Sequence, residues 1–341
     1  MVATPANDKL SWEKTRIVNL GVDWAVLNHR LSGEIDIYDK NTTNMLGQAP
    51  VDPTTGFTTV LSNIGSMTNK GVEFTINSVN TQAGDFEWMT SFNFTYNKNK
   101  LVDMYVEVPK SPYRMIDYDY WKGYPYGTVF AYKWAGLDPA DGMPRVYDSA
   151  GNIVRSVTDI DTEDAVSYAG TTIPPVFGSL SNTIQWCNWD LSFTFIYNMG
   201  HVLRNDVNTT FSYRLDHNLH NDFSKRWKNP GDEAKTDVPA YYSLKNTSIN
   251  ETDVLLLYRY ADVNVLSASF IKLREVSLGY QIPENACKAI GVKSANARLQ
   301  VSNLATFAFN GEGIDPEAFY FAGSRADRFR PFVSASLNVE F

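Results

Sequence analysis

The chain has 341 residues, a net charge of −8 and an aromatic content of 13%. No apolar run approaches the roughly 20 residues that a membrane-spanning helix needs, and no Lys/Arg cluster marks a surface for nucleic acid. The mean hydropathy of −0.29 does not exclude a transmembrane β-barrel, whose strands alternate apolar and polar residues.

Alternation with a period of two dominates the chain, which predicts an all-β protein built of hairpins. In the clearest segment, Trp189, Leu191 and Phe193 face away from Asp190 and Ser192. Strands are predicted at 17–27, 30–38, 72–77, 86–97, 127–136, 176–186, 189–199, 268–282 and 296–307, and from Phe329 to the terminal Phe341. One helical turn is expected in the linker ENACKAIGVKSANA, and a short helix within RWKNPGDEAK.

The predicted connections fall into two length classes that alternate. Short links lie at 28–29, 80–85 and 187–188, and long ones at 40–70, 100–125, 204–266 and 308–326. Short turns on one rim and long loops on the other are typical of an outer-membrane barrel. Four tryptophans lie near strand ends, where a girdle of aromatic residues at the membrane interface would place them. They are Trp24, Trp88, Trp186 and Trp189.

The direction of successive strands tests this topology. Counted from the first strand, 86–97 ascends and 127–136 descends; counted back from the last strand, 176–186 also descends. Two consecutive descending strands cannot be neighbours, so one ascending strand is missing between 137 and 175. The segment MPRVYD at 143–148 is the candidate, which brings the expected total to about twelve strands. The terminal strand then ends at the short-turn, periplasmic rim.

Several stretches, in order along the chain, closely resemble the barrels of SusC/RagA-type TonB-dependent transporters. They are LSWEKTRIVNLGVDWAVLNHRLSGEIDIYDKNT (10–42), NIGSMTNKGVEFTI (63–76), FEWMTSFNFTYNKNKLVDM (86–104), SFIKLREVSLGYQIP (269–283) and VSNLATF with GIDPE (301–317). The resemblance implies the C-terminal part, about 10–12 strands, of an antiparallel transmembrane β-barrel of 22 strands in the outer membrane.

The same resemblance implies partners and a nutrient. They are a SusD/RagB-like surface lipoprotein, TonB acting through an N-terminal region, outer-membrane lipid, and an oligosaccharide or peptide substrate. We expect residues 1–341 to be barrel, without plug domain or signal peptide, and the final Phe341 to resemble the signal that such barrels show to their assembly machinery.

Two aromatic segments are candidate ligand-binding sites, because flat apolar faces beside polar groups suit sugars and peptides. The first, YRMIDYDYWKGYPYG, supplies six aromatic residues, and the second, EAFYFAGSRADRFR, supplies one aromatic and one basic residue. The candidates are Tyr113, Tyr118, Tyr120, Trp121, Tyr124, Tyr126, Tyr320 and Arg325. The alternative is that these aromatics form an interfacial girdle or pack neighbouring loops together.

No motif of an enzyme, a cofactor or a metal site stands out. His217 and His220 lie near Asp216 and Asp222, but no third ligand has a recognisable spacing. Cys187 and Cys287 are interpreted as unpaired structural cysteines, with a disulfide left open.

The sequence thus favours part of an outer-membrane transporter that does no covalent chemistry. The alternative is a soluble, secreted all-β module that binds carbohydrate, and a degenerate gene product remains a third. Six apolar residues discriminate the transporter from the soluble module: Leu191, Phe193, Phe195, Val333, Leu337 and Val339. They should form an exposed apolar band in a barrel and a buried core in a sandwich.

Overall fold

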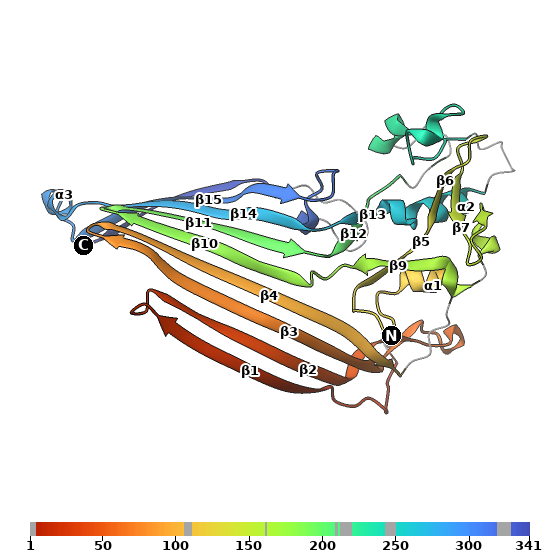
Figure 1. Ribbon diagram of the computed structural model, residues 1–341, viewed down its shortest axis with the longest axis horizontal. Helices are drawn as coiled ribbons and strands as arrows, with labels where there is room; N and C mark the ends of the chain where they lie inside the picture. Colours follow the sequence, from red (N-terminus) through yellow and green to blue (C-terminus); the bar gives the residue numbers. More distant parts are fainter. Residues whose placement is uncertain are drawn as a thin grey trace.

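The computed structural model describes residues 5–105, 111–160, 162–208, 211, 220–242, 250–318 and 329–341. Its main element is a nine-stranded antiparallel sheet, here called the wall, in the order β1-β2-β3-β4-β10-β11-β14-β15-β16 (Figure 1). The wall strands are β1 (Lys14–Val26), β2 (Leu31–Pro50), β3 (Thr59–Ala83), β4 (Phe86–Met104), β10 (Val176–Trp186), β11 (Trp189–Met199), β14 (Phe270–Gln281), β15 (Ser294–Ala308) and β16 (Phe332–Glu340).

Short connections gather at one end of the wall and long ones at the other (Figure 1). Asn28 and His29 turn the chain between β1 and β2 with positive φ angles of 54° and 63°, and Cys187-Asn188 joins β10 to β11. The short helix α3 (Glu284–Ala289) joins β14 to β15 at the same rim and confirms the helical turn expected there. The segregation of short and long connections is therefore as predicted.

The register of the wall separates its two faces. Leu191 lies between Ile184 of β10 and Leu278 of β14, whereas the next residue, Ser192, lies between Thr183 and Ser277. Many apolar side chains on the first face are exposed, among them Val18, Leu20, Val22, Ile37, Leu278, Leu299, Val333, Leu337 and Val339. On the same face, Leu191, Phe193 and Phe195 are only partly exposed. We call this the outward face, and the polar one the lumenal face.

Nothing in the described part of the chain packs a second sheet on the outward face. The other sheets are small and lie at the long-loop end of the wall (Figure 1). The buried apolar clusters lie among the long loops, at their rim and around α3. An exposed apolar band on a single-layer sheet does not favour the soluble sandwich, whose core would bury these residues.

The long connections fold into a loop assembly with its own core. Its strands are β5 (Thr128–Tyr132), β6 (Trp134–Leu137), β7 (Pro144–Tyr147), β8 (Ile153–Val154), β9 (Val166–Thr171), β12 (Val202–Arg204) and β13 (Val265–Ser267). Its helices are α1 (Pro112–Asp117) and α2 (Glu251–Arg259). Short 3₁₀ helices span Pro53–Thr55, Val157–Asp159, Glu163–Ala165, Asn221–Lys225, Asp232–Ala234, Asp262–Asn264 and Pro316–Ala318.

The prediction of a wall strand at 127–136 is wrong, and so is the prediction of a missing strand between 137 and 175. β4 pairs directly with β10, from Phe86↔Trp186 to Tyr96↔Val176, so strand direction alternates without an extra strand. β5 is buried along its whole length and pairs with β9, and 143–148 contributes only to the small β6-β7-β8 sheet. The described wall therefore has nine strands rather than 10–12.

Two other segments differ from the prediction. The long loop expected at 40–70 is mostly strand, because β2 and β3 stay paired as far as Pro50↔Thr59. Their Thr- and Asn-rich ends have no alternation of apolar and polar residues, which hid the strands. In the expected irregular stretch 204–266, α2 was missed, while the 3₁₀ turn Asp232–Ala234 confirms a short helical segment in RWKNPGDEAK.

No helix in the described ranges is long and apolar enough to cross a membrane.

Candidate functional site

A cavity of about 460 Å³ lies at the long-loop rim of the wall. All three of the longest connections line it. The β4–β10 connection contributes residues around α1 and the start of β5, the β11–β14 connection contributes 201–207 and the end of α2, and the β15–β16 connection contributes Pro316. We call this space the rim cavity.

Backbone pairing continues the wall into the cavity and so positions its lining. Beyond the end of β11, β12 pairs with β13, with Val202 opposite Ser267 and Arg204 opposite Val265. The N–H of Ala268 donates to the carbonyl of His201 at 2.9 Å, and the N–H of Asn205 donates to Asn264 O at 2.8 Å. Residues 201–205 are therefore held along one edge by hydrogen bonds to residues 264–268.

Arg204 is the cationic side chain most deeply set in this lining. One guanidinium nitrogen, Nη2, donates to the carbonyl of Phe130, and the guanidinium lies over the ring of Tyr260 at 5.1 Å from its centroid. The other terminal nitrogen, Nη1, is buried and has no hydrogen-bond partner among the described residues. Burial lowers the pKa of Arg204 to about 10, so the side chain remains charged at neutral pH.

Three further polar atoms, on residues that line the cavity, are buried without a hydrogen-bond partner in the part of the chain that the structure describes. They are Oγ1 of Thr128, Nδ1 of His201 and Oδ1 of Asn205. Thr128 is 4% exposed and His201 is 8% exposed. Burial lowers the pKa of His201 to about 4, which makes its imidazole neutral at pH 7. Buried polar atoms almost always have partners, so four unpaired atoms on residues that line one cavity are unusual.

The remaining lining carries charges of both signs. Asp117, Asp119 and Asp206 contribute carboxylates, and Arg259 adds a second guanidinium. Burial raises the pKa of Asp119. The acidic groups outnumber the basic ones, which disfavours a strongly anionic occupant.

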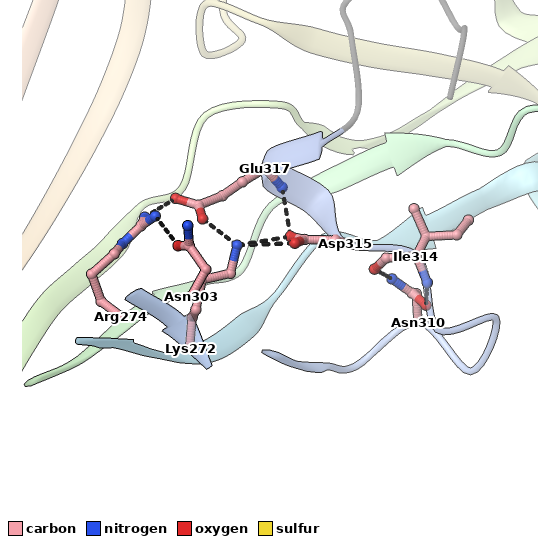
Figure 2. Close-up of polar contacts among 7 residues, drawn as sticks. All are labelled: Lys272, Arg274, Asn303, Asn310, Ile314, Asp315 and Glu317. Atoms are coloured by element: carbon pink, nitrogen blue, oxygen red, sulfur yellow. Dashed lines mark hydrogen bonds and ion pairs between the residues drawn. The ribbon is translucent and has the colours of Figure 1, made fainter. Parts of the chain in front are cut away.

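Pro316 reaches the cavity because an ion-pair network holds its two neighbours. Lys272 Nζ, on the lumenal side of β14, lies 3.0 Å from Asp315 Oδ2 and also pairs with Glu317 (Figure 2). Glu317 in turn accepts from Arg274 Nη2 at 2.5 Å. Asn310 closes the preceding turn, since its amide donates to Ile314 O at 2.7 Å and its Oδ1 accepts from Ile314 N at 3.1 Å.

The six aromatic candidates of the first predicted segment divide between cavity, core and surface. Tyr118 lines the rim cavity and contacts Tyr120 and Trp121 edge to face, at 5.7 and 6.4 Å between ring centroids. Trp121 and Tyr124 pack in the loop core, where Tyr124 lies 4.9 Å from Phe130. Tyr113 and Tyr126 are exposed away from the cavity lining.

Ligand binding by these residues stays a prediction. Tyr320 and Arg325 lie outside the described residues, as does His217. In the described ranges no group of three His, Cys, Asp or Glu residues could hold a metal ion. Cys187 and Cys287 are both free, as interpreted from the sequence.

Sequence reasoning missed Thr128, Arg204 and Asn205, and gave His201 no role. HVLRND at 201–206 follows the end of β11 and has the composition of an ordinary polar loop. Only the loss of hydrogen-bond partners on folding distinguishes these atoms. No local pattern carries that information.

Comparisons with known proteins agree with this architecture. Residues 2–150 match the family model described as TonB dependent receptor-like, beta-barrel. TonB-dependent receptor P3 of Formosa agariphila is 27% identical over 334 residues, covering 92% of this chain and 32% of that protein. TonB-dependent receptor SusC of Bacteroides thetaiotaomicron is 26% identical over 334 residues, with 91% and 30% coverage. The chain thus spans about a third of the length of these curated relatives.

A solved structure shows the same fold. The chain superposes on a structure of the RagAB peptide transporter with a TM-score of 0.78, covering 100% of this chain and 37% of that one at 24% identity. The chain is therefore similar to TonB-dependent receptors along most of its length, and its residues 2–150 match the beta-barrel model of that family.

Proposed function

We propose that residues 1–341 form the C-terminal part of the barrel of a TonB-dependent transporter, which imports an oligosaccharide or peptide across the outer membrane. The observation that carries the proposal is the division of the wall. Its outward face is apolar, its lumenal face is polar, and its long connections converge on one cavity at a single rim. Such a wall holds a water-filled or plugged lumen beneath a ligand-binding surface.

The lumenal face supports passage rather than chemistry. Asp36 accepts from Asn19 Nδ2 at 2.8 Å, and Asp190 pairs with Arg298 at 3.0 Å, so charged groups along the lumen are matched by neighbours on the wall. We assign no covalent step to this chain. Energy from TonB would reach it through another part of the transporter.

A SusD/RagB-like surface lipoprotein is the partner we propose. Its place would be over the loop assembly, which stands beyond the rim at the end of the wall opposite α3 (Figure 1). The support is the likeness to SusC and to RagAB. Residues Tyr113 and Tyr126, which are exposed on this assembly, are candidates for contact with the partner or with the nutrient.

The topology can be tested with two matched epitope insertions. Gly84 lies in the short β3–β4 turn and Gly151 in the loop assembly, and at both a side chain would meet open space. In intact cells an antibody should bind the epitope at Gly151, and should bind the epitope at Gly84 only after the outer membrane is permeabilised. Equal accessibility of the two, or recovery of the protein in the culture medium, contradicts the proposal.

The partner is tested separately. Affinity purification of the tagged transporter from outer membranes should recover a surface lipoprotein in about equimolar amount. Loss of the transporter gene should abolish uptake of the labelled nutrient.

A further inference from the structure

A row of polar side chains crosses the outward face of the wall near the short-turn rim. Thr90 of β4 lies opposite Ser78 of β3 and Asn182 of β10. Asn182 is two residues from Ile184 on β10 and therefore shares the outward face with it. Polar groups are costly on a face that meets lipid and are kept there where they have a function.

Hydrogen bonds run through these side chains in one direction. Ser78 Oγ donates to Asn80 Oδ1 at 2.9 Å, and Asn80 Nδ2 donates to Thr90 Oγ1 at 2.7 Å. Thr90 Oγ1 donates to Asn182 Oδ1 at 2.7 Å, and Trp88 Nε1 donates to the same oxygen at 2.9 Å. We call these five residues the outward polar cluster. Because an indole N–H can only donate, Trp88 requires that the Asn182 atom facing it is Oδ1 and not Nδ2.

The amide nitrogen of Asn182 is the free end of the cluster. Nδ2 makes no hydrogen bond within the described ranges, and it is not one of the buried atoms that lack a partner. It therefore remains accessible on the outward face, although Asn182 as a whole is only 8% exposed. An amide nitrogen can only donate, so the cluster presents one directed donor at its surface.

Arg30 adds a second donor nearer the rim. It directly precedes β2, and its Nη2 donates to the carbonyls of Val79 and Asn80 at 3.2 and 3.0 Å. Arg30 is exposed, and its Nε and Nη1 have no hydrogen-bond partner in the described part of the chain. Because Asn80 also belongs to the outward polar cluster, one residue joins the guanidinium to the cluster.

The two donors lie at different depths from the rim. Asn182 is four residues before Trp186, the last residue of β10. At about 3.3 Å per residue and a strand tilt of about 40°, this places Asn182 about 10 Å from the rim. Each headgroup region of a bilayer is about 5–8 Å thick, so Asn182 lies close to the boundary between headgroups and hydrocarbon. Arg30 lies at the rim, among the headgroups.

A diacyl glycerophospholipid matches this arrangement of donors. Its phosphate is anionic and accepts hydrogen bonds, which suits the guanidinium at the rim. Its ester carbonyls lie deeper and accept without donating, which suits Asn182 Nδ2. Its acyl chains would continue over apolar side chains such as Leu180 and Phe92, which lie opposite each other on the outward face.

A second copy of the chain matches the donors less well. Around the same cluster it would bring a second Arg30 against the first, and a second Asn182 whose Oδ1 already accepts two hydrogen bonds. Neither side chain supplies the acceptors that Arg30 and Asn182 Nδ2 require. The hydrogen-bonding groups of this surface therefore favour lipid over protein.

We propose that the outward polar cluster and Arg30 bind one diacyl glycerophospholipid of the periplasmic leaflet, with its phosphate at Arg30 and an ester carbonyl at Asn182 Nδ2. The inference rests on the proposed function, which makes the short-turn rim periplasmic and the outward face lipid-facing. The lipid would lie against β3, β4 and β10, which are neighbours in the wall (Figure 1). It would complete the hydrogen bonding of the cluster.

Native mass spectrometry of the purified transporter in detergent counts bound lipids and gives their dissociation constants. The first probe is dioleoyl phosphatidylethanolamine. The second is the same lipid with ether linkages in place of the esters, and the third is dioleoylglycerol, which lacks the phosphate. We expect one tight site, at which the first probe binds about tenfold more tightly than either of the other two.

Two substitutions test the two contacts separately. Asn182→Leu should weaken binding of the diester lipid about tenfold and leave binding of the diether lipid unchanged, because the ester carbonyl is the proposed partner. Arg30→Gln should weaken binding of phosphatidylethanolamine about tenfold and leave binding of dioleoylglycerol unchanged. Arg30→Lys keeps the positive charge and should retain most of the binding.

Two matched substitutions serve as controls. Asn93 lies on the lumenal face of β4, where its Nδ2 donates to Ser179 Oγ at 3.0 Å and its Oδ1 accepts from Thr75 Oγ1 at 3.1 Å. Arg16 is an exposed arginine near the long-loop end of β1, opposite Asn41. Asn93→Leu and Arg16→Gln should leave the binding of all three lipids unchanged.

Three results overturn the proposal. One is equal affinity for the diester and diether lipids, which leaves Asn182 without a lipid acceptor. Another is a loss of binding in Asn182→Leu that Asn93→Leu matches, which reflects the stability of the wall and not a contact. The third is a dimer of the transporter that Asn182→Leu dissociates, which assigns the face to a second copy. None of these changes the epitope topology or the lipoprotein recovery, so failure here is distinguishable from failure of the proposed function.

Discussion

The ammonium of Lys272 lies 3.1 and 3.0 Å from the two carboxylate oxygens of Asp315, and their side chains are 0% and 4% exposed. The pair joins β14 of the wall to the connection between β15 and β16. Because Pro316 follows Asp315 directly and lines the rim cavity, the pair sets the position of one cavity wall. It thus links the barrel to the candidate binding site.

Lys272→Met should destabilise the protein by about 3–5 kcal/mol, because it leaves Asp315 as an uncompensated buried charge. Adding Asp315→Asn should recover a large part of that loss, since Glu317 keeps its pairing with Arg274. Denaturant unfolding of the transporter in lipid vesicles, followed by tryptophan fluorescence, measures the free energy of unfolding of Lys272→Met and of the double variant. Additive losses in the double variant would show that the two residues are not coupled.

Asn303 should tolerate glycine better than valine. Its φ is 55°, in a bulge where Arg274 Nη1 donates to its Oδ1 at 3.0 Å. Both substitutions remove the acceptor, but valine also has to adopt a left-handed backbone at a cost of about 1–2 kcal/mol. Unfolding free energies of Asn303→Gly and Asn303→Val should differ by about that amount. Equal values would mean that the bulge relaxes.

Leu299 and Gln300 are adjacent on β15 but belong to opposite faces, opposite Leu278 and Ser277 respectively. Leu299 is 47% exposed on the outward face. Leu299→Arg should cost about 2–4 kcal/mol if that face meets lipid near the membrane centre, and Gln300→Arg about 1 kcal/mol or less. Denaturant unfolding of the protein in lipid vesicles compares the free energies of unfolding of Leu299→Arg and Gln300→Arg. Similar costs at both positions would contradict the assignment of faces.

His201 should make the loop rim sensitive to acid. Its folded pKa is about 4 because of burial, below the unfolded value of about 6.5. The unfolded state therefore binds more protons between these values, and stability is lost as pH falls from about 6.5 to about 4, with no effect above that window. His201→Phe should flatten this dependence.

Amide exchange at Ala268, whose N–H donates to His201 O, is a local measurement of that effect. After correction for intrinsic exchange rates, protection should fall with acidification in the parent and change less in His201→Phe. An identical pH dependence in both would show that another group controls the rim.

The candidate site was only partly predictable. Tyr118 was selected because an aromatic-rich loop suits ligands, and it lines the cavity. Trp121 came from the same segment but is 5% exposed within the loop core, because the loops bury their own apolar residues against one another. Thr128 and Arg204 carry no local signal, since their importance lies in hydrogen bonds that folding leaves unmade.

The sequence by itself determined the central part of each of the nine wall strands, their two faces and the segregation of short from long connections, but not the extended ends of β2 and β3. The reason is local, because the pleat sends successive side chains to opposite faces and a two-residue turn reverses the chain. Only the tertiary structure decided that 128–132 leaves the wall for the loop core, that β4 pairs with β10, and that Ile116, His201 and Pro316 border one cavity. These contacts join residues far apart in the chain, and which of them form depends on packing and burial that no short stretch encodes.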